Sequence, residues 1–263
     1  MKEKIIRKRP KCLTEKTFTY CSGCHHGIIH RLIAEIIDEL ELQEKIIAVV
    51  GVGCSVLGRK SEFFDIDAIG VAHGRAPAVA TGIKRMEPDK MVFTYQGDGD
   101  AAAIGLLETI HAANRGENIT IIFVNNAVYG MTGGQMAPTT LPGQKTTTTP
   151  DGRNPENYEG EPLPMCELLN VLKRPVYIAR VSVTSPGKVI EAKQAIRRAF
   201  ELQMKNKGFS FVEVLSACPT NWKMTPEQCL KYINEEMARY FPLGVFREPK
   251  LEEGECRCRL KKQ

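Results

Sequence analysis

The sequence predicts an α/β fold, a mainly parallel sheet with helices on both faces. One observation is that strand-like and helix-like segments alternate along most of the chain. Another is the composition: 263 residues, 43% hydrophobic and 25% charged, are typical of a globular protein and suffice for one large domain. A third is that glycines and reactive polar residues directly follow several predicted strands, and open parallel sheets bind ligands at the carboxyl ends of their strands.

Six segments have the apolar, β-branched or aromatic composition of buried strands. Residues 91–96 read Met-Val-Phe-Thr-Tyr-Gln, and 119–124 read Ile-Thr-Ile-Ile-Phe-Val. In chain order, the predicted strands are 45–50, 64–72, 91–96, 119–124, 176–181 and 209–215.

Helical patterns fall between and after these strands. The last predicted helix has Thr225 as its N-cap and Pro226 at its first position. Proline is tolerated there because the N–H that it lacks would have no partner within the helix. The predicted helices are 28–40, 76–85, a segment after Asp100, 188–204 and 226–240. We expect one domain over residues 20–244, with a basic tail over 1–19 and a charged tail over 245–263.

Residues 132–164 form a long segment without an apolar period. The segment is dense in glycine, proline and threonine, and it includes four consecutive threonines at 146–149. A loop of this length within a compact domain is usually functional or disordered. We expect it to cover a cofactor and contact another subunit.

Charge and hydropathy exclude several classes of protein. The net charge of +5 is modest, and the basic cluster at 2–11 is typical of a solvated tail or a partner contact rather than a nucleic-acid site. No apolar run approaches the roughly 18 residues of a membrane helix, and the N-terminus lacks the apolar core of a signal peptide. We expect a cytoplasmic protein that binds neither nucleic acid nor membrane.

A Gly-Asp-Gly turn follows strand 91–96 directly. Asp98 should therefore lie at the carboxyl edge of the sheet, where strand 119–124 also delivers Asn126. Carboxylate and amide oxygens suit Mg²⁺, which completes its octahedron with substrate phosphates. Gly97 and Gly99 let the backbone approach a diphosphate, and the N–H groups of the next helix would face its charge. Taken alone, the same three residues are also an ordinary surface turn.

Nine cysteines in a chain without secretory features indicate metal or redox chemistry rather than disulfides. Cys21 and Cys24 form a C-x-x-C before a helix, while Cys54 and Cys218 each follow a predicted strand. These four can share one site. The competing interpretations are a closed structural zinc site and buried free thiols.

Taken together, these motifs resemble a known family. Gly-Asp-Gly followed by a helix, a strand and Asn-Asn is similar to the thiamin diphosphate signature, and with the cysteines it resembles the thiamin diphosphate-binding β subunit of 2-oxoacid:ferredoxin oxidoreductases. The resemblance spans about residues 20–244 and includes 72–77, 81–82, 130–140, 143–146 and 218–222. Two departures occur in the C-x-x-C loop, where Ser22 replaces the family's proline and His25 a glycine.

The resemblance implies specific ligands. Mg²⁺ would bind to Asp98, Asn126 and the backbone of Val128, and a [4Fe-4S] cluster, which takes four thiolates, would bind to Cys21, Cys24, Cys54 and Cys218. The residues expected to bind the cofactors are Cys54, Ser55, His26, His73, Gly74, Gly97, Asp98, Gly99, Asp100, Asn126, Val128, Gly130, Met131 and Thr132.

The other cysteines and histidines receive structural interpretations. A histidine at a strand–helix turn is as often a capping or core group as a ligand contact, and only the resemblance favours ligand contact for His26 and His73. His30 and His111 fall within helical patterns, and Cys229 is interpreted as a packing residue of the last helix. Cys12, Cys166, Cys256 and Cys258 match no position of the family, and the last two form an exposed thiol pair in the charged tail.

The resemblance also implies an activity. Thiamin diphosphate supplies the carbanion that attacks a 2-oxoacid, and the cluster takes up the released electrons. Coenzyme A would accept the acyl group and ferredoxin the electrons. The family's activating glutamate lies on a partner α subunit, so no catalytic acid or base is assigned to this chain; γ and δ subunits can complete the complex.

Three functions remain open at this point. The first is the CoA-dependent oxidoreductase subunit, with branched-chain 2-oxoacids favoured over 2-oxoglutarate. The second is a non-oxidative thiamin diphosphate-dependent 2-oxoacid decarboxylase subunit, in which the cysteines are incidental or bind zinc. The third is a metal-binding scaffold without catalysis, which would bind no thiamin diphosphate.

Overall fold

The computed structural model describes residues 8–58 and 63–250. Its centre is a seven-stranded sheet in the order β2-β1-β3-β4-β6-β5-β7, in which every neighbouring pair is parallel except β5 and β7. The predicted α/β class with a mainly parallel sheet is confirmed. The strands are β1 Ile46–Val50, β2 Asp67–Gly70, β3 Met91–Gly97, β4 Thr120–Asn125, β5 Tyr177–Ser182, β6 Ser210–Leu215 and β7 Gly244–Arg247.

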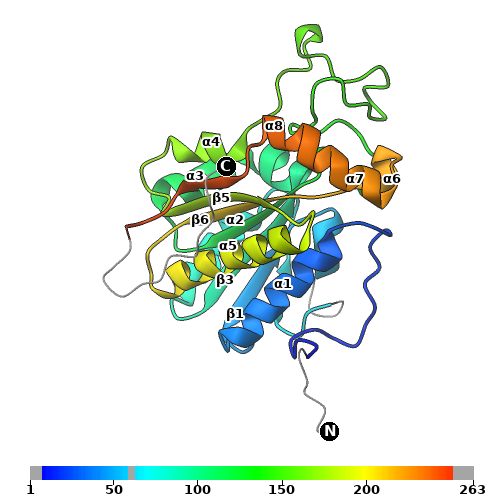
Figure 1. Cartoon of the computed structure of the whole chain (residues 1–263). Helices are drawn as coiled ribbons and strands as arrows, with labels where there is room; N and C mark the ends of the chain where they lie inside the picture. The colour runs from blue at the N-terminus through cyan, green and yellow to red at the C-terminus, as the bar shows by residue number, and fades with distance from the viewer. Residues whose placement is uncertain (1–7, 59–62, 251–263) are drawn as a thin grey trace, which may run out of the picture.

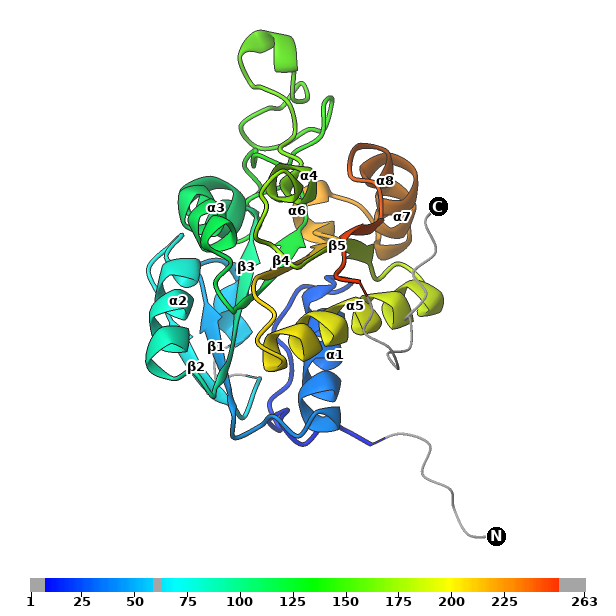
Figure 2. The same ribbon diagram turned by 90° about the vertical axis from the view of Figure 1, so that its left-hand side faces the viewer.

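Helices cover both faces of the sheet, as Figures 1 and 2 show. Helices α1 and α5 pack on one face, and α2, α3 and α4 on the other. The α-helices are α1 His26–Glu39, α2 Ala76–Met86, α3 Leu106–Arg115, α4 Met165–Asn170, α5 Pro186–Met204, α6 Pro219–Trp222, α7 Pro226–Tyr232 and α8 Ala238–Tyr240.

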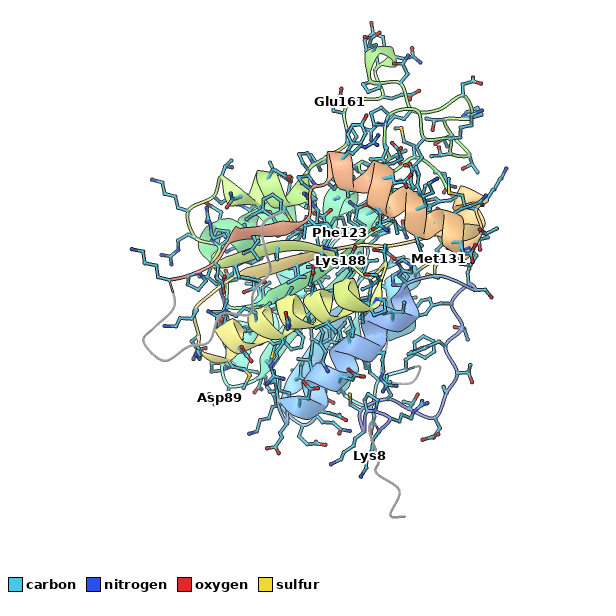
Figure 3. All side chains as sticks on the ribbon, viewed as in Figure 1. Lys8, Asp89, Phe123, Met131, Glu161 and Lys188 are labelled. Carbon is cyan, nitrogen blue, oxygen red and sulfur yellow. The ribbon has the colours of Figure 1, made fainter. Side chains whose placement is uncertain are left out.

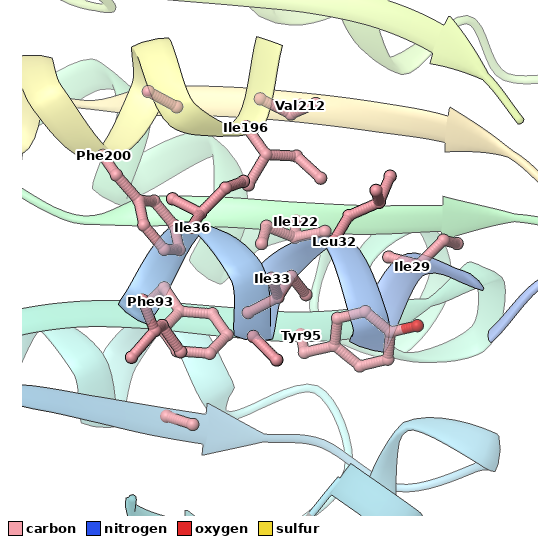
Figure 4. Packing of buried hydrophobic residues seen from close by; sticks show 14 of the residues in the cluster. Ile29, Leu32, Ile33, Ile36, Phe93, Tyr95, Ile122, Ile196, Phe200 and Val212 are labelled. Carbon is pink, nitrogen blue, oxygen red and sulfur yellow. The ribbon is translucent and has the colours of Figure 1, made fainter. Parts of the chain in front are cut away.

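The core between α1, α5 and the sheet is built from helix stripes that repeat every three or four residues. Figure 4 shows α1 and α5 side chains meeting those of the central strands. Burying each such side chain contributes about 1.5–3 kcal/mol, so this face anchors the central strands that carry the site. The side chains labelled in Figure 4 are Ile29, Leu32, Ile33, Ile36, Phe93, Tyr95, Ile122, Ile196, Phe200 and Val212.

Two predicted elements differ from the structure. The predicted strand 64–72 is reduced to β2, because Phe64 pairs instead with Leu13 in an antiparallel bridge. The predicted helix 226–240 begins as expected, with Thr225 and Gln228 forming a capping box. It is then interrupted by a π-helical segment, η4 Ile233–Met237, before α8.

Three short elements had no pattern that predicted them. Helices α4 and α6 are too short for a recognisable period, and β7 has only half-buried side chains. Outside the expected domain of residues 20–244, Cys12 and Leu13 are buried in the main core cluster, and β7 reaches Arg247. Residues 1–7 of the basic tail, together with Cys256 and Cys258, lie outside the described residues.

Residues 130–164 follow β4 and form the projecting segment, part of which extends beyond the body of the molecule (Figure 1). They contain one short 3₁₀ turn, η3 Pro155–Asn157, and Glu161 lies on the projecting part (Figure 3). The Arg153 guanidinium organises the segment by donating to the carbonyls of Pro138, Glu159 and Glu161, each at 2.9 Å. The side chain of Arg153 therefore ties the long loop together through its backbone carbonyls.

Candidate functional site

The site lies at the carboxyl edge of the central strands. Strands β3 and β4 are neighbours in the sheet, and their register pairs Gly97 with Val124. Asp98 and Asn125 therefore leave adjacent strands at the same level. Strand β1 ends on their other side at Val50, followed by the turn that leads to Cys54. Several loops thus converge at the edge where α/β sheets bind ligands.

Asp98 is fully enclosed by the loops around it. Its Oδ2 accepts the backbone N–H of Asn126 at 3.0 Å, and its Oδ1 accepts the hydroxyl of Thr139 from the projecting segment. Burial raises the pKa of the Asp98 carboxyl to about 7, although the Thr139 and Asn126 hydrogen bonds act in the opposite direction. A neighbouring cation would stabilise the charged form of this carboxylate.

The side-chain amide of Asn126 has two possible orientations with different consequences. With its nitrogen toward the site, it donates to Val128 O at 2.7 Å and to Asp98 Oδ2 at 2.9 Å. In the opposite orientation three oxygen atoms, one each from Asn126, Val128 and Asp98, face one another. Such an arrangement repels unless a cation lies among the oxygens, and a carboxylate, an amide and a carbonyl are ligands that Mg²⁺ accepts. These three residues therefore fit a magnesium ion.

A π-helix, η2 Asp98–Ile104, replaces the expected start of an α-helix after the Gly-Asp-Gly turn. Gly105 N donates to Asp100 O at 2.9 Å, which closes a wide turn of the kind frequent at functional sites. This turn sends two carboxylates to different neighbours. Asp98 meets Asn126, whereas Asp100 accepts from the backbone N–H groups of Val52 and Gly74.

A cavity of about 250 Å³ opens beside these carboxylates. Thirteen of the fourteen residues expected to bind the cofactors line it; the exception, Gly74, lies behind the wall and donates its N–H to Asp100. The backbone of Gly74 has φ +79°, and a Cβ there would collide with Ile104 and Gly105. Sequence reasoning missed four lining residues, Val52, Gly53, Ile104 and Tyr129. They lie beside recognised motifs, and only Tyr129 among them carries a functional group, its phenol, that could have identified it.

The four expected cluster cysteines lie on neighbouring loops. Burial, with contributions from nearby Cys218, Cys54 and Cys21, raises the pKa of Cys24 to about 12. Burial likewise raises the pKa of Cys54 to about 11, with contributions from Cys218 and Cys21. The thiols are thus close enough for the charge of each to oppose ionisation of the next. Asn221 Nδ2 donates to Cys218 Sγ at 3.1 Å, a hydrogen bond that favours the thiolate.

The donor set fits a polynuclear cluster. Within residues 8–58 and 63–250, no group of three His, Cys, Asp or Glu side chains could hold one metal ion. A [4Fe-4S] cluster does not require such convergence, because each of its four irons takes a separate cysteine. Four thiols that would repel one another as thiolates suit a cationic iron core.

His26 connects the cysteine loops to the cavity. Its Nδ1 is 2.6 Å from the hydroxyl of buried Tyr95, and its ring stacks on Tyr20 with centroids 4.9 Å apart. Burial, with a contribution from His25, lowers the pKa of His26 to about 4. His25 itself accepts the backbone N–H of Ala217 at 3.2 Å, so its side chain braces the loop before Cys218. His30 packs against Tyr20 and Tyr95 as well, in line with its predicted structural role.

The chain is similar to proteins of known function. Residues 51–214 match the family "Thiamine pyrophosphate enzyme, C-terminal TPP binding domain". Ketoisovalerate oxidoreductase subunit VorA of Methanothermobacter thermautotrophicus is 54% identical over 233 residues, which is 89% of this chain and 48% of that protein. The 2-oxoglutarate synthase subunit KorB of Archaeoglobus fulgidus is 36% identical over 244 residues, 89% of this chain and 86% of that protein.

A solved structure is also similar. It is 2-oxoglutarate:ferredoxin oxidoreductase from Magnetococcus marinus with 2-oxoglutarate, coenzyme A and succinyl-CoA bound. Its matching chain has a TM-score of 0.78 and 28% identity over 95% of this chain and 88% of that one. The present chain spans about half the length of the VorA relatives, 48% of one and 53% of the other.

Fold and site together define a thiamin diphosphate-binding domain. Within that class, the chain belongs to the family of thiamin diphosphate-binding subunits of 2-oxoacid:ferredoxin oxidoreductases. In the part of the chain that the structure describes, no helix is both long enough and apolar enough to cross a membrane.

Proposed function

We propose that this chain binds Mg²⁺–thiamin diphosphate and a [4Fe-4S] cluster and acts, with a partner α subunit, in the CoA-dependent oxidative decarboxylation of a branched-chain 2-oxoacid. Electrons would leave through the cluster to ferredoxin, and γ and δ subunits can complete the assembly. The observation that carries this proposal is the convergence of Asp98, Asn126 and Val128 O beside a cavity that Cys54 also lines.

Asp98, Asn126 and the carbonyl of Val128 would hold the magnesium ion. Gly97 and Gly99 line the cavity beside them and leave room for a diphosphate. When bound, thiamin diphosphate supplies a carbanion that adds to the keto carbon and stabilises the electrons left after decarboxylation. This chain binds and orients the cofactor, and it encloses the Asp98 carboxylate away from water.

Cys21, Cys24, Cys54 and Cys218 would hold the iron–sulfur cluster. Cys54 lines the cavity and also belongs to the cysteine group, so the two cofactors would lie close together. His26 lines the same cavity and follows Cys24 by two residues. This closeness supports electron transfer from the organic cofactor to the cluster.

The residues that line the cavity favour a substrate with an uncharged side chain. Among the described residues that line it there is neither lysine nor arginine, while Val52, Ile104 and Met131 are apolar. A distal carboxylate such as that of 2-oxoglutarate would need a cationic partner. The VorA relatives, named for ketoisovalerate, are also more similar to this chain than the KorB relatives are. Both observations favour a branched-chain 2-oxoacid.

The apolar side chains at the mouth of the cavity support a contact with a partner subunit. Val52, Ile104 and Met131 are 42%, 51% and 50% exposed although they line the cavity, and Leu107 on α3 is 66% exposed. Large apolar side chains grouped around a ligand site are typical of surfaces that another protein covers. The α subunit would close the cavity there and supply the activating glutamate.

The test is a cofactor analysis of the complex, purified anaerobically after co-expression with its partner subunits. We expect about four irons, matching sulfide and one thiamin diphosphate per chain, and faster CoA-dependent ferredoxin reduction with 2-oxoisovalerate than with 2-oxoglutarate. Cys54→Ser should lose iron, whereas Cys229→Ser, in buried packing on α7, should retain it. Thiamin diphosphate with zinc or no metal would point to a non-oxidative decarboxylase, and absence of thiamin diphosphate would leave a scaffold.

A further inference from the structure

The second carboxylate of the π-helix, Asp100, is as buried as the first but has a separate environment. Only 1% of its surface is exposed, and no Lys or Arg side chain pairs with it among the described residues. A buried carboxylate is costly unless hydrogen bonds compensate for its lost hydration. The identity of those hydrogen-bond donors therefore indicates what the residue does.

Three nitrogen atoms converge on Oδ1 of Asp100. They are the Nδ1 of His73 at 2.8 Å and the backbone N–H groups of Gly74 at 2.8 Å and Val52 at 3.2 Å. The turns after β1 and β2 thus both depend on one oxygen atom. A Cβ at Gly51 would collide with this carboxylate, so the chain leaves the space open for it.

The other oxygen, Oδ2, accepts from the side-chain amide of Gln96 on β3. Gln96 is itself oriented, because its Oε1 accepts the hydroxyl of Thr94 at 2.7 Å. Both side chains are fully buried. A series of hydrogen bonds therefore runs from Thr94 inside the sheet through Gln96 and Asp100 to His73 at the cavity wall. These bonds fix the orientation of the Gln96 amide and of the Asp100 carboxylate.

The orientation of the Asp100 carboxylate determines which ring nitrogen of His73 carries a proton toward it. An ionised carboxylate only accepts hydrogen bonds, and Oδ1 already accepts two backbone N–H groups, so Nδ1 of His73 carries the proton. With Nδ1 facing the carboxylate, Nε2 is the ring nitrogen left to face the cavity. Its neighbour Cε1 lies against the Gly-Asp-Gly turn, 3.5 Å from the position of a Cβ on Gly99, and His73 lines the cavity.

We propose that Asp100 is a positioning residue that holds His73 as the Nδ1–H tautomer, so that Nε2 is a hydrogen-bond acceptor directed at the ligand of the cavity. The ligand group it suits is an O–H or N–H donor, which either the organic cofactor or the 2-oxoacid could present. Naming these two ligands rests on the proposed function, whereas the tautomer does not. The same arrangement, a carboxylate behind a histidine, orients the imidazole in hydrolase triads.

The first experiment needs no cofactor. The full chain has five histidines, so selective ¹⁵N-histidine labelling gives five ring systems, and His73→Phe identifies the one of interest. At neutral pH we expect the nitrogen shifts of His73 to show protonated Nδ1 and unprotonated Nε2. Protonation at Nε2 instead would overturn the proposal while leaving thiamin diphosphate binding, and hence the proposed function, untouched.

The second experiment removes the acceptor. In Asp100→Leu the His73 shifts should move toward a mixture of tautomers, whereas Asp89→Leu, on an exposed turn, should leave them unchanged. An unchanged His73 tautomer in folded Asp100→Leu would show that Asp100 does not set it. If Asp100→Leu does not fold, the wild-type spectrum still decides between the two tautomers.

A double-mutant cycle in the assembled complex tests whether Asp100 acts through His73. We expect His73→Phe to lower kcat or cofactor affinity about tenfold, the effect of one hydrogen bond, and Asp100→Asn to cost no more once His73 is already Phe. A weaker thiamin diphosphate affinity without substrate would assign the donor to the cofactor; a loss in kcat alone would assign it to the 2-oxoacid. If the losses caused by His73→Phe and Asp100→Asn instead multiply in the double variant, Asp100 does not act through His73 and the positioning role is overturned.

Discussion

Asn125 and Glu213 are joined across the sheet: Asn125 Nδ2 on β4 donates to Glu213 Oε1 on β6 at 2.7 Å. The Oδ1 of the same amide accepts the N–H of Ala127, which has the uncommon φ of +57°. A carboxylate with no exposed surface thus supports the turn that presents Asn126 and the Val128 carbonyl. Arg180, also fully buried, donates to the other Glu213 oxygen at 2.8 Å and keeps that carboxylate compensated.

Glu213→Leu should destabilise the chain by about 3–5 kcal/mol, because it leaves the Arg180 guanidinium buried with one partner fewer. Denaturant unfolding of the purified chain measures this loss. Glu167→Gln, on the more exposed side of the same guanidinium, should cost about 1 kcal/mol or less. Equal losses of unfolding free energy in the two variants would show that the buried Arg180–Glu213 ion pair contributes no more than the more exposed Arg180–Glu167 pair.

Thr139→Val should weaken Mg²⁺-dependent binding of thiamin diphosphate about tenfold, the lower end of the effect seen when a group that orients a metal ligand is removed. The hydroxyl of Thr139 donates to Asp98 and fixes its carboxylate. A Mg²⁺ titration of cofactor binding in the assembled complex tests this. Thr120→Val, whose hydroxyl donates to Gln203 at the opposite end of β4, is the matched control; a similar loss there would contradict the role of Thr139.

Gly51→Ala should destabilise the chain by about 1–3 kcal/mol, since the added methyl would occupy the space of the Asp100 carboxylate. Gly82→Ala offers a comparison within α2, where a Cβ meets nothing within 4 Å and should stabilise by up to about 1 kcal/mol. Thermal unfolding of the two variants should therefore shift in opposite directions. A Gly51→Ala chain as stable as wild type would mean that Asp100 can move aside without cost.

Arg153→Lys should open the projecting segment locally. The guanidinium reaches carbonyls on both sides of the segment, whereas an ammonium has only three donors at one point. We expect amide hydrogen exchange over residues 137–163 to accelerate about tenfold or more, while the sheet stays protected. Arg239→Lys, an exposed guanidinium on α8, should change nothing; unaltered exchange in Arg153→Lys would assign the order of the segment to other contacts.

His30→Phe should make the chain less sensitive to acid. Burial, with a contribution from His26, lowers the pKa of His30 well below 6.5, so the unfolded chain binds a proton there that the folded chain does not. Stability is therefore lost as the pH falls below about 6.5, at up to about 1.4 kcal/mol per pH unit. The variant should show a shallower decline of unfolding free energy from pH 6.5 to 5, while near pH 8 the histidine proton contributes no difference. Parallel declines would contradict the buried neutral state of His30.

The sequence predicted the fold class and most of the strands because buried parallel strands are continuous apolar runs, as in β3 and β4. It also predicted which residues meet at the sheet edge, since the carboxyl ends of parallel strands share one side. It could not predict that Thr139, far along a loop without any period, returns to Asp98. Contacts of this kind depend on long-range closure, for which a local pattern carries no signal.

The sequence did not predict the π-helix η2, for a related reason. The segment 98–104 has the alanines and glycine of an ordinary helix start, and the wide turn is imposed by the packing of Gly105 against Gly74 and by the separate partners of the two carboxylates. Similarly, Asp100 reads in the sequence as one more turn residue. Its importance emerges only when the turns after β1 and β2 are brought to it by the sheet order.

The wide turn of η2 belongs both to the core of the sheet and to the site. A π-helix has one residue more per turn than the hydrogen-bonding pattern of an α-helix needs, so deleting one alanine from 101–103 would let β3 continue directly into a regular α3. Such a deletion would also remove or shift Ala101 and Ala102, which are buried in the core beneath α2, α3 and α4. The turn therefore serves two purposes: its alanines fill the core, and its width directs Asp98 to Asn126 and Asp100 to His73.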